Sequence, residues 1–235
     1  MFPNANKKLI AIIQARLSST RLPGKVLLPF GQGTILECLV SRLRKATSIS
    51  RIVIATSNES TDDNLADFIL TNNIAELYRG SLLNVFSRYQ EIAFLFESDY
   101  YLRITADCPL VCPDLVDSMF LTTKEMNLDF CSNSHEKGIT KGFDLELYSR
   151  ALMLSIKQEQ LSRYDLEHVT PVMYEIEKSA VLLLKYDQDP RLKGLNLSID
   201  TLQDYAFLKK LEGDHQISRL SYKEIKNILL TQVSG

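Results

Sequence analysis

Residues 8–25, KLIAIIQARLSSTRLPGK, are the stretch of sequence that decides the fold. The first seven are rich in isoleucine and predict a buried strand, and the polar residues after them predict a long loop. In an open α/β sheet, ligands bind beyond the carboxyl ends of the strands, which is where the loop of residues 14–25 must lie. The stretch therefore predicts an α/β fold whose first strand leads into a ligand-binding loop.

Strands and helices alternate through the first half of the chain. The apolar patterns predict strands at 52–56, 75–78 and 100–105, and helices at 35–43, 61–69, 83–96 and 113–119. Strands that alternate with helices of this length indicate βαβ units, and so a mainly parallel sheet flanked by helices.

The alternation breaks after residue 128. Here the pattern predicts strands at 130–133, 143–148, 181–185 and 197–200, and helices at 165–174, 202–211 and 222–231. No linker, internal repeat or low-complexity segment divides the chain. We therefore expect a single domain over residues 1–235, with a small β-rich insertion at about residues 129–185.

Composition excludes several classes of protein. Lys plus Arg number 27 and Asp plus Glu number 29, and this balance argues against a nucleic-acid or membrane-surface binder. The longest purely apolar runs have five residues, so neither a transmembrane helix nor a signal peptide is expected. The four cysteines form no disulfide framework, and Cys108 and Cys112 lack partners for a zinc site. A soluble, cytoplasmic protein is expected.

The loop after the first strand carries three cations, Arg16, Arg21 and Lys25, with Ser18, Ser19 and Thr20 between them. Small residues let backbone N–H groups approach phosphate oxygens, and arginine supplies a forked donor for the same oxygens. The loop matches neither the GxxxxGK[ST] nor the GxGxxG pattern. A basic loop is often only solvated surface, but its place after the first strand favours phosphate binding.

Two carboxylates stand at the ends of predicted strands. Asp107 follows the strand at 100–105, and Asp200 ends the strand predicted at 197–200. Carboxylates facing the same crevice as the basic loop suit Mg²⁺, which prefers oxygen ligands and keeps water and substrate phosphates as the others. In the alternative interpretation, Asp107 caps the helix near Pro113 and Asp200 caps the helix after it.

Six blocks of sequence, in order along the chain, carry a family resemblance: QARLSSTRLPGKVL (14–27), IVIATSN (52–58), YRGSLLNVFSRY (78–89), YLRITADCPLVCPDLVD (101–117), EHVTP (167–171) and LSIDTLQD (197–204). With them the chain resembles the CTP-dependent cytidylyltransferases that activate 3-deoxy-ulosonic acids such as sialic acids and Kdo, in particular the SpsF-like branch. The resemblance spans about residues 8–212.

The resemblance implies a GT-A-like (Rossmann-like) fold that binds CTP and Mg²⁺, with an acidic sugar as acceptor. By motif match, Arg16, Arg21 and Lys25 hold the phosphates with the loop residues between them, and Asp107 and Asp200 bind the metal. The implied base and ribose contacts are Ala15, Leu17, Thr56, Asn58, Arg79, Gly80 and Ser81. The implied acceptor contacts are Asp144, Glu146, Glu167 and His168, although a structural hydrogen bond is an equal alternative for His168. It also implies a homodimer through the insertion.

The sequence departs from the SpsF-like pattern at four places. Asn84 replaces an acidic residue, Leu166 replaces an arginine, Thr201-Leu202 replaces Thr-Pro, and Lys141 stands where proline is common. These positions surround the expected base and acceptor pockets rather than the phosphate loop. They therefore leave the substrate more open than the reaction.

The expected function is transfer of CMP from CTP to an ulosonic acid with release of pyrophosphate, for surface polysaccharide synthesis. The alternatives are a GT-A glycosyltransferase that uses a nucleotide-sugar, a sugar-1-phosphate nucleotidyltransferase, and a nucleotide-binding module without activity. Three cations in one loop suit a triphosphate better than a diphospho-sugar, and the presence of both aspartates argues against the inactive module.

Overall fold

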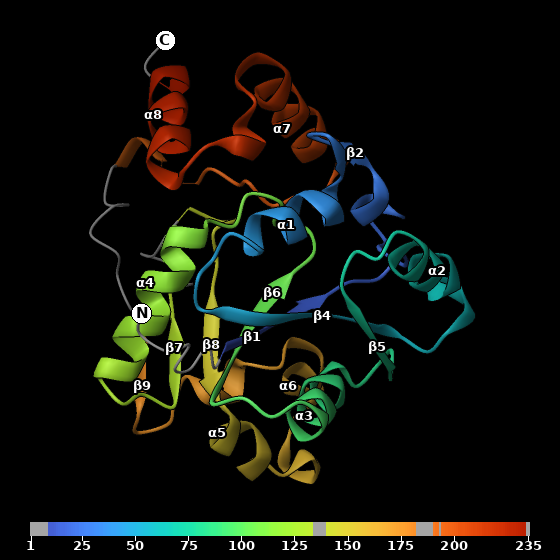
Figure 1. Cartoon of the computed structure of the whole chain (residues 1–235), viewed down its shortest axis with the longest axis vertical. Coiled ribbons are helices and arrows are strands. Elements are labelled where there is room, and N and C mark those ends of the chain that lie inside the picture. Colours follow the sequence, from blue (N-terminus) through green and yellow to red (C-terminus); the bar gives the residue numbers. More distant parts are fainter. Residues whose placement is uncertain (1–8, 134–139, 182–189, 193, 234–235) are drawn as a thin grey trace, which may run out of the picture.

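The computed structural model describes residues 9–133, 140–181, 190–192 and 194–233, and a seven-stranded sheet forms their centre (Figure 1). β8 runs antiparallel to both of its neighbours, and all other neighbouring strands of this sheet are parallel. The strands in spatial order are β5 (Glu76–Gly80), β4 (Ile49–Ser57), β1 (Leu9–Gln14), β6 (Tyr100–Thr105), β8 (Glu146–Ser149), β7 (Phe130–Ser132) and β9 (Ser179–Val181). A separate small hairpin joins β2 (Pro29–Phe30) to β3 (Gly33–Thr34).

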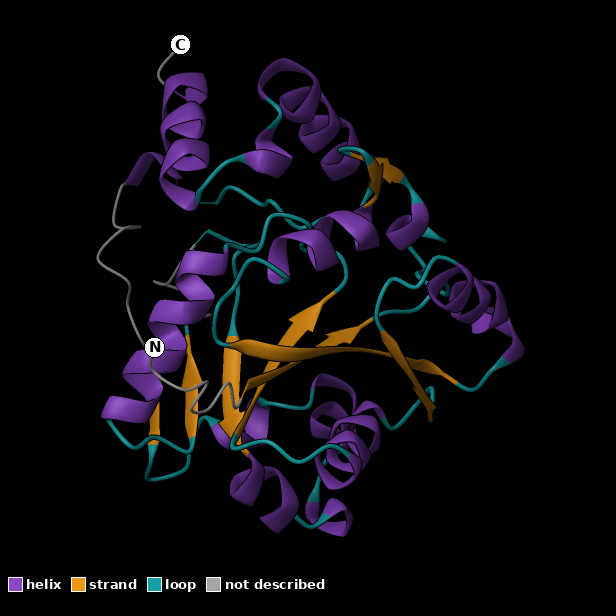
Figure 2. Cartoon of the chain, in the orientation of Figure 1, coloured by secondary structure: helices purple, strands orange, loops and turns teal. Residues whose placement is uncertain are grey.

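Helices cover both faces of the sheet, so the fold has three layers (Figure 2). One face packs against α1 (Ile35–Leu43), α2 (Asp63–Thr71), α4 (Pro113–Glu125), α7 (Leu202–His215) and α8 (Tyr222–Val233). The other face packs against α3 (Val85–Leu95), α5 (Arg150–Ser155) and α6 (Arg163–His168). The expected α/β fold with a mainly parallel sheet is confirmed.

The first strand lies in the middle of the core because both of its faces are apolar. Leu9, Ala11 and Ile13 belong to the core on one side of the sheet, and Ile10 and Ile12 to the core on the other. Side chains alternate across a strand, so an uninterrupted apolar run fits a strand that is buried on both sides. β1 pairs in parallel with β4 and β6, and the loop after it emerges where those strands also end.

Two predicted elements differ from the structure. The helix expected at 165–174 is two pieces, α6 and a 3-10 turn at Pro171–Met173, because Val169 between them has a positive φ of 70°. The strand expected at 197–200 is an extended segment without a ladder. It is held by single hydrogen bonds from Leu197 N to Lys141 O and from Ile199 N to Asp107 O, both 2.8 Å.

The expected insertion at 129–185 contributes strands to the same central sheet. β7, β8 and β9 extend it beyond β6, with β8 paired directly to β6. Residues 134–139, and 182–185 of the strand expected at 181–185, lie outside the described residues. A role of this region in acceptor binding or dimerisation stays a prediction. Among the described helices, none is long and apolar enough to cross a membrane.

Candidate active site

The loop after β1 is fixed to the end of the neighbouring strand by a buried carboxylate. Asp62 Oδ1 accepts a hydrogen bond from Leu17 N at 2.7 Å, and its other oxygen accepts one from Ser57 at the end of β4. Gly24 closes the loop, with φ 69° and its N–H donating to Leu17 O. Asp62 therefore positions the basic loop, a role that the sequence did not indicate because it depends on tertiary contact.

Lys25 joins the two predicted metal ligands. Its Nζ lies 2.8 Å from Asp107 Oδ2 and 3.0 Å from Asp200 Oδ1. The side chains of Lys25 and Asp200 are each only 11% exposed, and that of Asp107 is 21% exposed. Three charged groups from distant parts of the sequence thus meet at the carboxyl end of the sheet.

Neither aspartate caps a helix. The N-cap of α7 is Thr201, whose hydroxyl accepts from Asp204 N while Asp204 accepts from Thr201 N, which completes a capping box. The N-cap of α4 is Cys112, whose side chain makes no capping hydrogen bond. The alternative interpretation of Asp107 and Asp200 as helix caps is therefore wrong, and their carboxylates face charged partners instead.

Two further cations lie within ion-pair distance of Asp200. Arg21 Nη2 lies 2.9 Å from Asp200 Oδ1, and Lys141 Nζ lies 3.2 Å from Asp200 Oδ2. Burial by itself would raise the pKa of Asp200, but hydrogen bonds and charge from Lys25 and Lys141 outweigh burial and lower it. With Lys25, three cations surround one carboxylate, so the cluster has surplus positive charge for an anionic ligand.

A pocket of 330 Å³ opens on this cluster. It is lined by ten of the predicted site residues, namely Ala15, Arg16, Ser19, Thr20, Arg21, Lys25, Asp107, Glu167, His168 and Asp200. Gln14, Arg103 and Thr105 also line it, and the sequence analysis did not single them out. The structure thus brings the phosphate loop, both aspartates and the Glu167-His168 pair to one cavity.

Of the predicted base and ribose contacts, Ala15 lines this pocket, whereas Thr56, Asn58 and residues 79–81 lie outside its lining, at the ends of β4 and β5. Asn58 N donates to Gly80 O at 2.8 Å, which joins the ends of β4 and β5. Arg79 donates to the carbonyl oxygens of Ser57 and Glu59 and pairs with Asp63 at 2.7 Å. Arg79 therefore braces the turn after β4, and a contact of Thr56, Asn58 or residues 79–81 with a base stays a prediction.

The predicted acceptor contacts divide into two groups. Glu167 and His168 line the pocket from α6, on the face of the sheet that α3 and α5 also cover (Figure 1). Asp144 and Glu146 do not line it: Asp144 accepts from Gly142 N, and Glu146 pairs with Arg103. Arg103 is the residue of this region that sequence reasoning missed, because an arginine inside a strand pattern is usually solvent-exposed.

The donor set around Lys25 fits a divalent magnesium ion. Asp107 and Asp200 both direct a carboxylate oxygen at one ammonium group, so this position already stabilises positive charge. Two carboxylates are what proteins commonly offer Mg²⁺, with water and substrate phosphates as its remaining ligands. No group of three or more His, Cys, Asp or Glu side chains placed to hold a metal occurs in the described part of the chain.

The cysteines near the site are suited to packing rather than to metal binding. Burial, followed by the negative charge of Asp107, raises the pKa of the Cys108 thiol well above its ordinary value. Burial also raises the pKa of Cys112, to about 11. Both thiols thus stay protonated at neutral pH.

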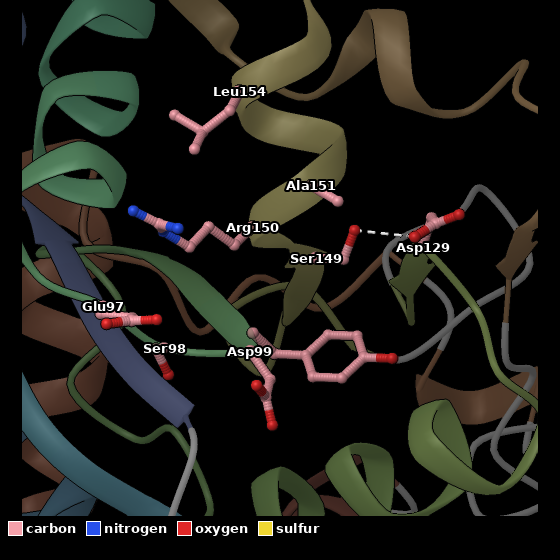
Figure 3. A pocket seen from close by; sticks show the side chains of 9 residues that line it. Glu97, Ser98, Asp99, Asp129, Ser149, Arg150, Ala151 and Leu154 are labelled. Atoms are coloured by element: carbon pink, nitrogen blue, oxygen red, sulfur yellow. Dashed lines mark hydrogen bonds between the residues drawn. The ribbon is translucent and has the colours of Figure 1, made fainter.

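A larger pocket of 740 Å³ lies at the opposite end of β6 (Figure 3). It is lined by residues 97–100 before and at the start of β6, together with Asp129 and residues of α5. Figure 3 shows Ser149 hydrogen-bonded to Asp129, with Arg150 and Leu154 following along α5. This pocket lacks the basic loop and both clustered aspartates, so the smaller pocket is the candidate active site.

Comparison with known proteins agrees with this geometry. A cytidylyltransferase from Leptospira borgpetersenii has the same fold, with a TM-score of 0.86 and 29% identity over 97% of this chain and 95% of that chain. The spore coat polysaccharide biosynthesis protein SpsF of Bacillus subtilis is 31% identical over 86% of this chain and 85% of its own length. The 3-deoxy-manno-octulosonate cytidylyltransferase of Solibacter usitatus is 30% identical, over 49% of this chain and 44% of its own length. Because the sequence profile of the family described as Cytidylyltransferase also matches residues 10–233, the chain belongs to the cytidylyltransferase family.

Proposed function

We propose that this cytidylyltransferase transfers CMP from CTP to a 3-deoxy-ulosonic acid, of the sialic acid or Kdo kind, and releases pyrophosphate. The observation that carries the proposal is the pocket lined by Arg16, Arg21 and Lys25 together with Asp107 and Asp200. Arg16, Arg21, Lys25 and the adjacent Lys141 carry four positive charges against the two negative charges of Asp107 and Asp200, and this surplus matches the roughly two negative charges that CTP keeps with one Mg²⁺. The partial likeness to a 3-deoxy-manno-octulosonate cytidylyltransferase supports the choice of acceptor.

In this account the basic loop binds the triphosphate. Arg16 and the loop residues Ser19 and Thr20 line the pocket and offer donors to phosphate oxygens. Arg21 is 64% exposed and Lys25 is buried, so Arg21 reaches the outer part of the triphosphate while Lys25 acts from below it. Both supply charge where pyrophosphate leaves, and such stabilisation acts mainly in the transition state.

Asp107 and Asp200 would hold Mg²⁺ against the phosphates, where the ion neutralises charge and lowers the pKa of a bound hydroxyl group. The acceptor hydroxyl oxygen attacks the α-phosphorus of CTP, the bond from that phosphorus to the bridging oxygen breaks, and the hydroxyl proton passes to water. The chain's own part is alignment of the two substrates and neutralisation of charge. Because the sequence offers no dedicated general base, no residue is assigned that role.

The acceptor would bind on the side of the pocket formed by α6. Glu167 and His168 line that side and can bind sugar hydroxyl groups. Lys141, which departs from the SpsF-like pattern, brings another cation beside Asp200 and is 59% exposed. This cation is suited to the carboxylate of an acidic sugar, and it distinguishes the chain from relatives with proline there.

A role in surface polysaccharide synthesis, a cytoplasmic location and a homodimer through residues 129–185 are parts of the same proposal. The likeness to SpsF supports the first of these. Light scattering on the purified chain tests the last: a mass twice the 26.7 kDa of one chain is expected, and a mass of one chain contradicts it.

The experiment that tests the function is a pyrophosphate-release screen of the four ribonucleoside triphosphates against ulosonic acids and sugar 1-phosphates, with Mg²⁺. We expect release only with CTP and an ulosonic acid. Release with a sugar 1-phosphate would replace the proposal by sugar-1-phosphate nucleotidyl transfer. The Lys25→Met variant is the control for contaminating enzymes, because it should lose the activity while a contaminant would not.

A further inference from the structure

A buried ion pair lies beneath the acceptor side of the pocket. Arg103 on β6 and Glu146 on β8 stand opposite each other in the antiparallel register, and Arg103 Nη1 lies 2.5 Å from Glu146 Oε2. Their side chains are only 14% and 10% exposed. Removing one member of such a pair leaves the other charge buried without a partner, which is strongly unfavourable. Each side chain therefore holds the other in one fixed arrangement.

The carboxylate of Glu146 accepts hydrogen bonds from three groups within the protein. Its Oε2 faces Arg103, and its Oε1 accepts from the hydroxyl groups of Thr170 and Tyr174, each at 2.8 Å. Glu146 is absent from the lining of the 330 Å³ pocket, whereas Arg103 reaches that lining. These bonds, and the absence of Glu146 from the pocket lining, do not favour the direct contact with the sugar that the family resemblance implies.

The residue before Thr170 has a strained backbone. Val169 has φ 70° and ψ −55°, and Thr170 N donates to His168 O at 2.8 Å, so residues 168–170 form a γ-turn. This turn is rare, and a positive φ is especially unfavourable for a β-branched residue. Val169 is also fully buried. Strain of this kind persists only where the surrounding contacts enforce it, and it is concentrated at functional sites.

The turn is flanked by the burial of Val169 in the core and by the hydrogen bond from Thr170 to Glu146. Thr170 is 2% exposed, and its hydroxyl reaches Glu146 at one end of the turn. His168 is at the other end, where it lines the pocket with Glu167. Because only Val169 separates the two residues, a displacement of Thr170 should also displace His168.

We propose that Arg103, Glu146 and Thr170 are positioning residues that hold the turn at Val169 and so fix Glu167 and His168 toward the acceptor sugar. The identity of the sugar rests on the proposed function, but the path from Arg103 to His168 consists of contacts within this chain. Glu146 then acts on the acceptor without touching it.

The variant Thr170→Val tests this proposal, because it keeps the shape of the side chain and removes only the hydroxyl group. We expect the KM for the acceptor to rise by about tenfold, as positional errors near a reacting group are costly. The KM for CTP should stay unchanged, since the phosphate loop is on the other side of the pocket. Thr170→Ser keeps the hydroxyl and should restore the acceptor KM.

A merely structural role gives a different pattern. If Thr170→Val lowers the melting temperature while the acceptor KM stays at the wild-type value, the positioning role is wrong. Equal increases in both KM values contradict it as well, because they indicate general damage to the fold.

A measurement without substrate separates this inference from the proposed function. In ¹H–¹³C spectra of the histidine rings, Thr170→Val should shift the His168 signal, and Thr170→Ser should leave it in place. His215 at the end of α7 is the internal control. An unshifted His168 signal overturns the inference. If the wild type releases no pyrophosphate with any acidic sugar, the proposed function fails, and this spectrum still decides the positioning role.

Discussion

The ammonium group of Lys25 lies 2.8 Å from a carboxylate oxygen of Asp107, although 82 residues separate the two in the sequence. The same ammonium group lies 3.0 Å from Asp200, which is a further 93 residues along the chain. The fold thus places one cation of the phosphate loop between the two proposed metal ligands. Lys25 thus stabilises two carboxylates that would otherwise repel each other.

Replacement of Lys25 by methionine should therefore affect both folding and activity. The free energy of unfolding at pH 7 should fall, because the carboxylates of Asp107 and Asp200 lose a shared cationic partner. The kcat/KM for CTP should fall, by an amount that corresponds to a loss of about 2–4 kcal/mol of transition-state stabilisation. Denaturant unfolding and pyrophosphate release measure the two effects. Wild-type activity in this variant would contradict the assignment of Lys25 to the leaving group.

Arg21→Ala should reduce kcat/KM for CTP to a similar extent, which corresponds to about 2–4 kcal/mol of transition-state stabilisation. The free energy of unfolding should change little. Its side chain is 64% exposed, so it contributes little to burial, but its charge acts on the departing pyrophosphate. Arg51→Ala is the matched control, because Arg51 also pairs with a carboxylate, Glu76 at 3.0 Å, outside the pocket. Small and equal effects in steady-state kinetics would mean that the loop is ordinary solvated surface.

Asp107→Asn should give a folded protein that is nearly inactive. The side chain lies at the pocket and contributes little to the core, whereas in the proposed function its charge holds Mg²⁺ beside the phosphates. Circular dichroism checks the fold, pyrophosphate release checks the activity, and EDTA should abolish the wild-type activity. Full activity of Asp107→Asn in Mg²⁺, or of the wild type in EDTA, would show that the metal assignment is wrong.

The lowered pKa of Asp200 predicts a pH-dependent contribution to stability. Burial opposes ionisation, but Lys25 and Lys141 more than compensate, so the folded pKa lies below the unfolded value near 3.8. The stabilisation is therefore complete above about pH 4 and is lost as the pH falls through the folded pKa.

Comparison with Asp200→Asn isolates this contribution. Urea unfolding of the wild type and the variant should differ most at pH 7, and the difference should shrink as the pH is lowered below 3.8. A difference that stays constant from pH 7 to pH 3 would mean that Asp200 is not stabilised in its ionised form.

The core of the site could be predicted from the sequence because its signals are local. The apolar run of residues 9–13 indicates a buried strand, and the cations that follow must then emerge at the carboxyl end of the sheet. Asp107 follows β6, which pairs directly with β1, so its approach to the loop follows from the order of the strands. The sequence therefore predicted that Asp107 faces the same crevice as the basic loop, and the structure adds the ion pair between Lys25 and Asp107.

Other parts depended on tertiary contacts that no local pattern carries. In the sequence, Asp62 is one of several acidic residues near the start of a predicted helix. Only the hydrogen bond from Leu17 N shows that Asp62 positions the basic loop. Arg103 becomes a buried partner because β8 runs antiparallel beside β6 and places Glu146 opposite it. The apolar spacing across residues 165–174 suggested one helix, whereas Val169 breaks it at a turn whose next residue, Thr170, is bonded to Glu146.

Calorimetric titration of the free protein with CTP and Mg²⁺, compared with CDP-sugars and UDP-sugars under the same conditions, tests the central claim most directly. The cluster of Arg16, Arg21 and Lys25 should bind the triphosphate, because a nucleotide-sugar lacks the γ-phosphate and leaves part of this charge without a partner. We expect the protein to bind CTP more tightly than any nucleotide-sugar. Tighter binding of a CDP- or UDP-sugar would contradict nucleotidyl transfer and favour glycosyl transfer.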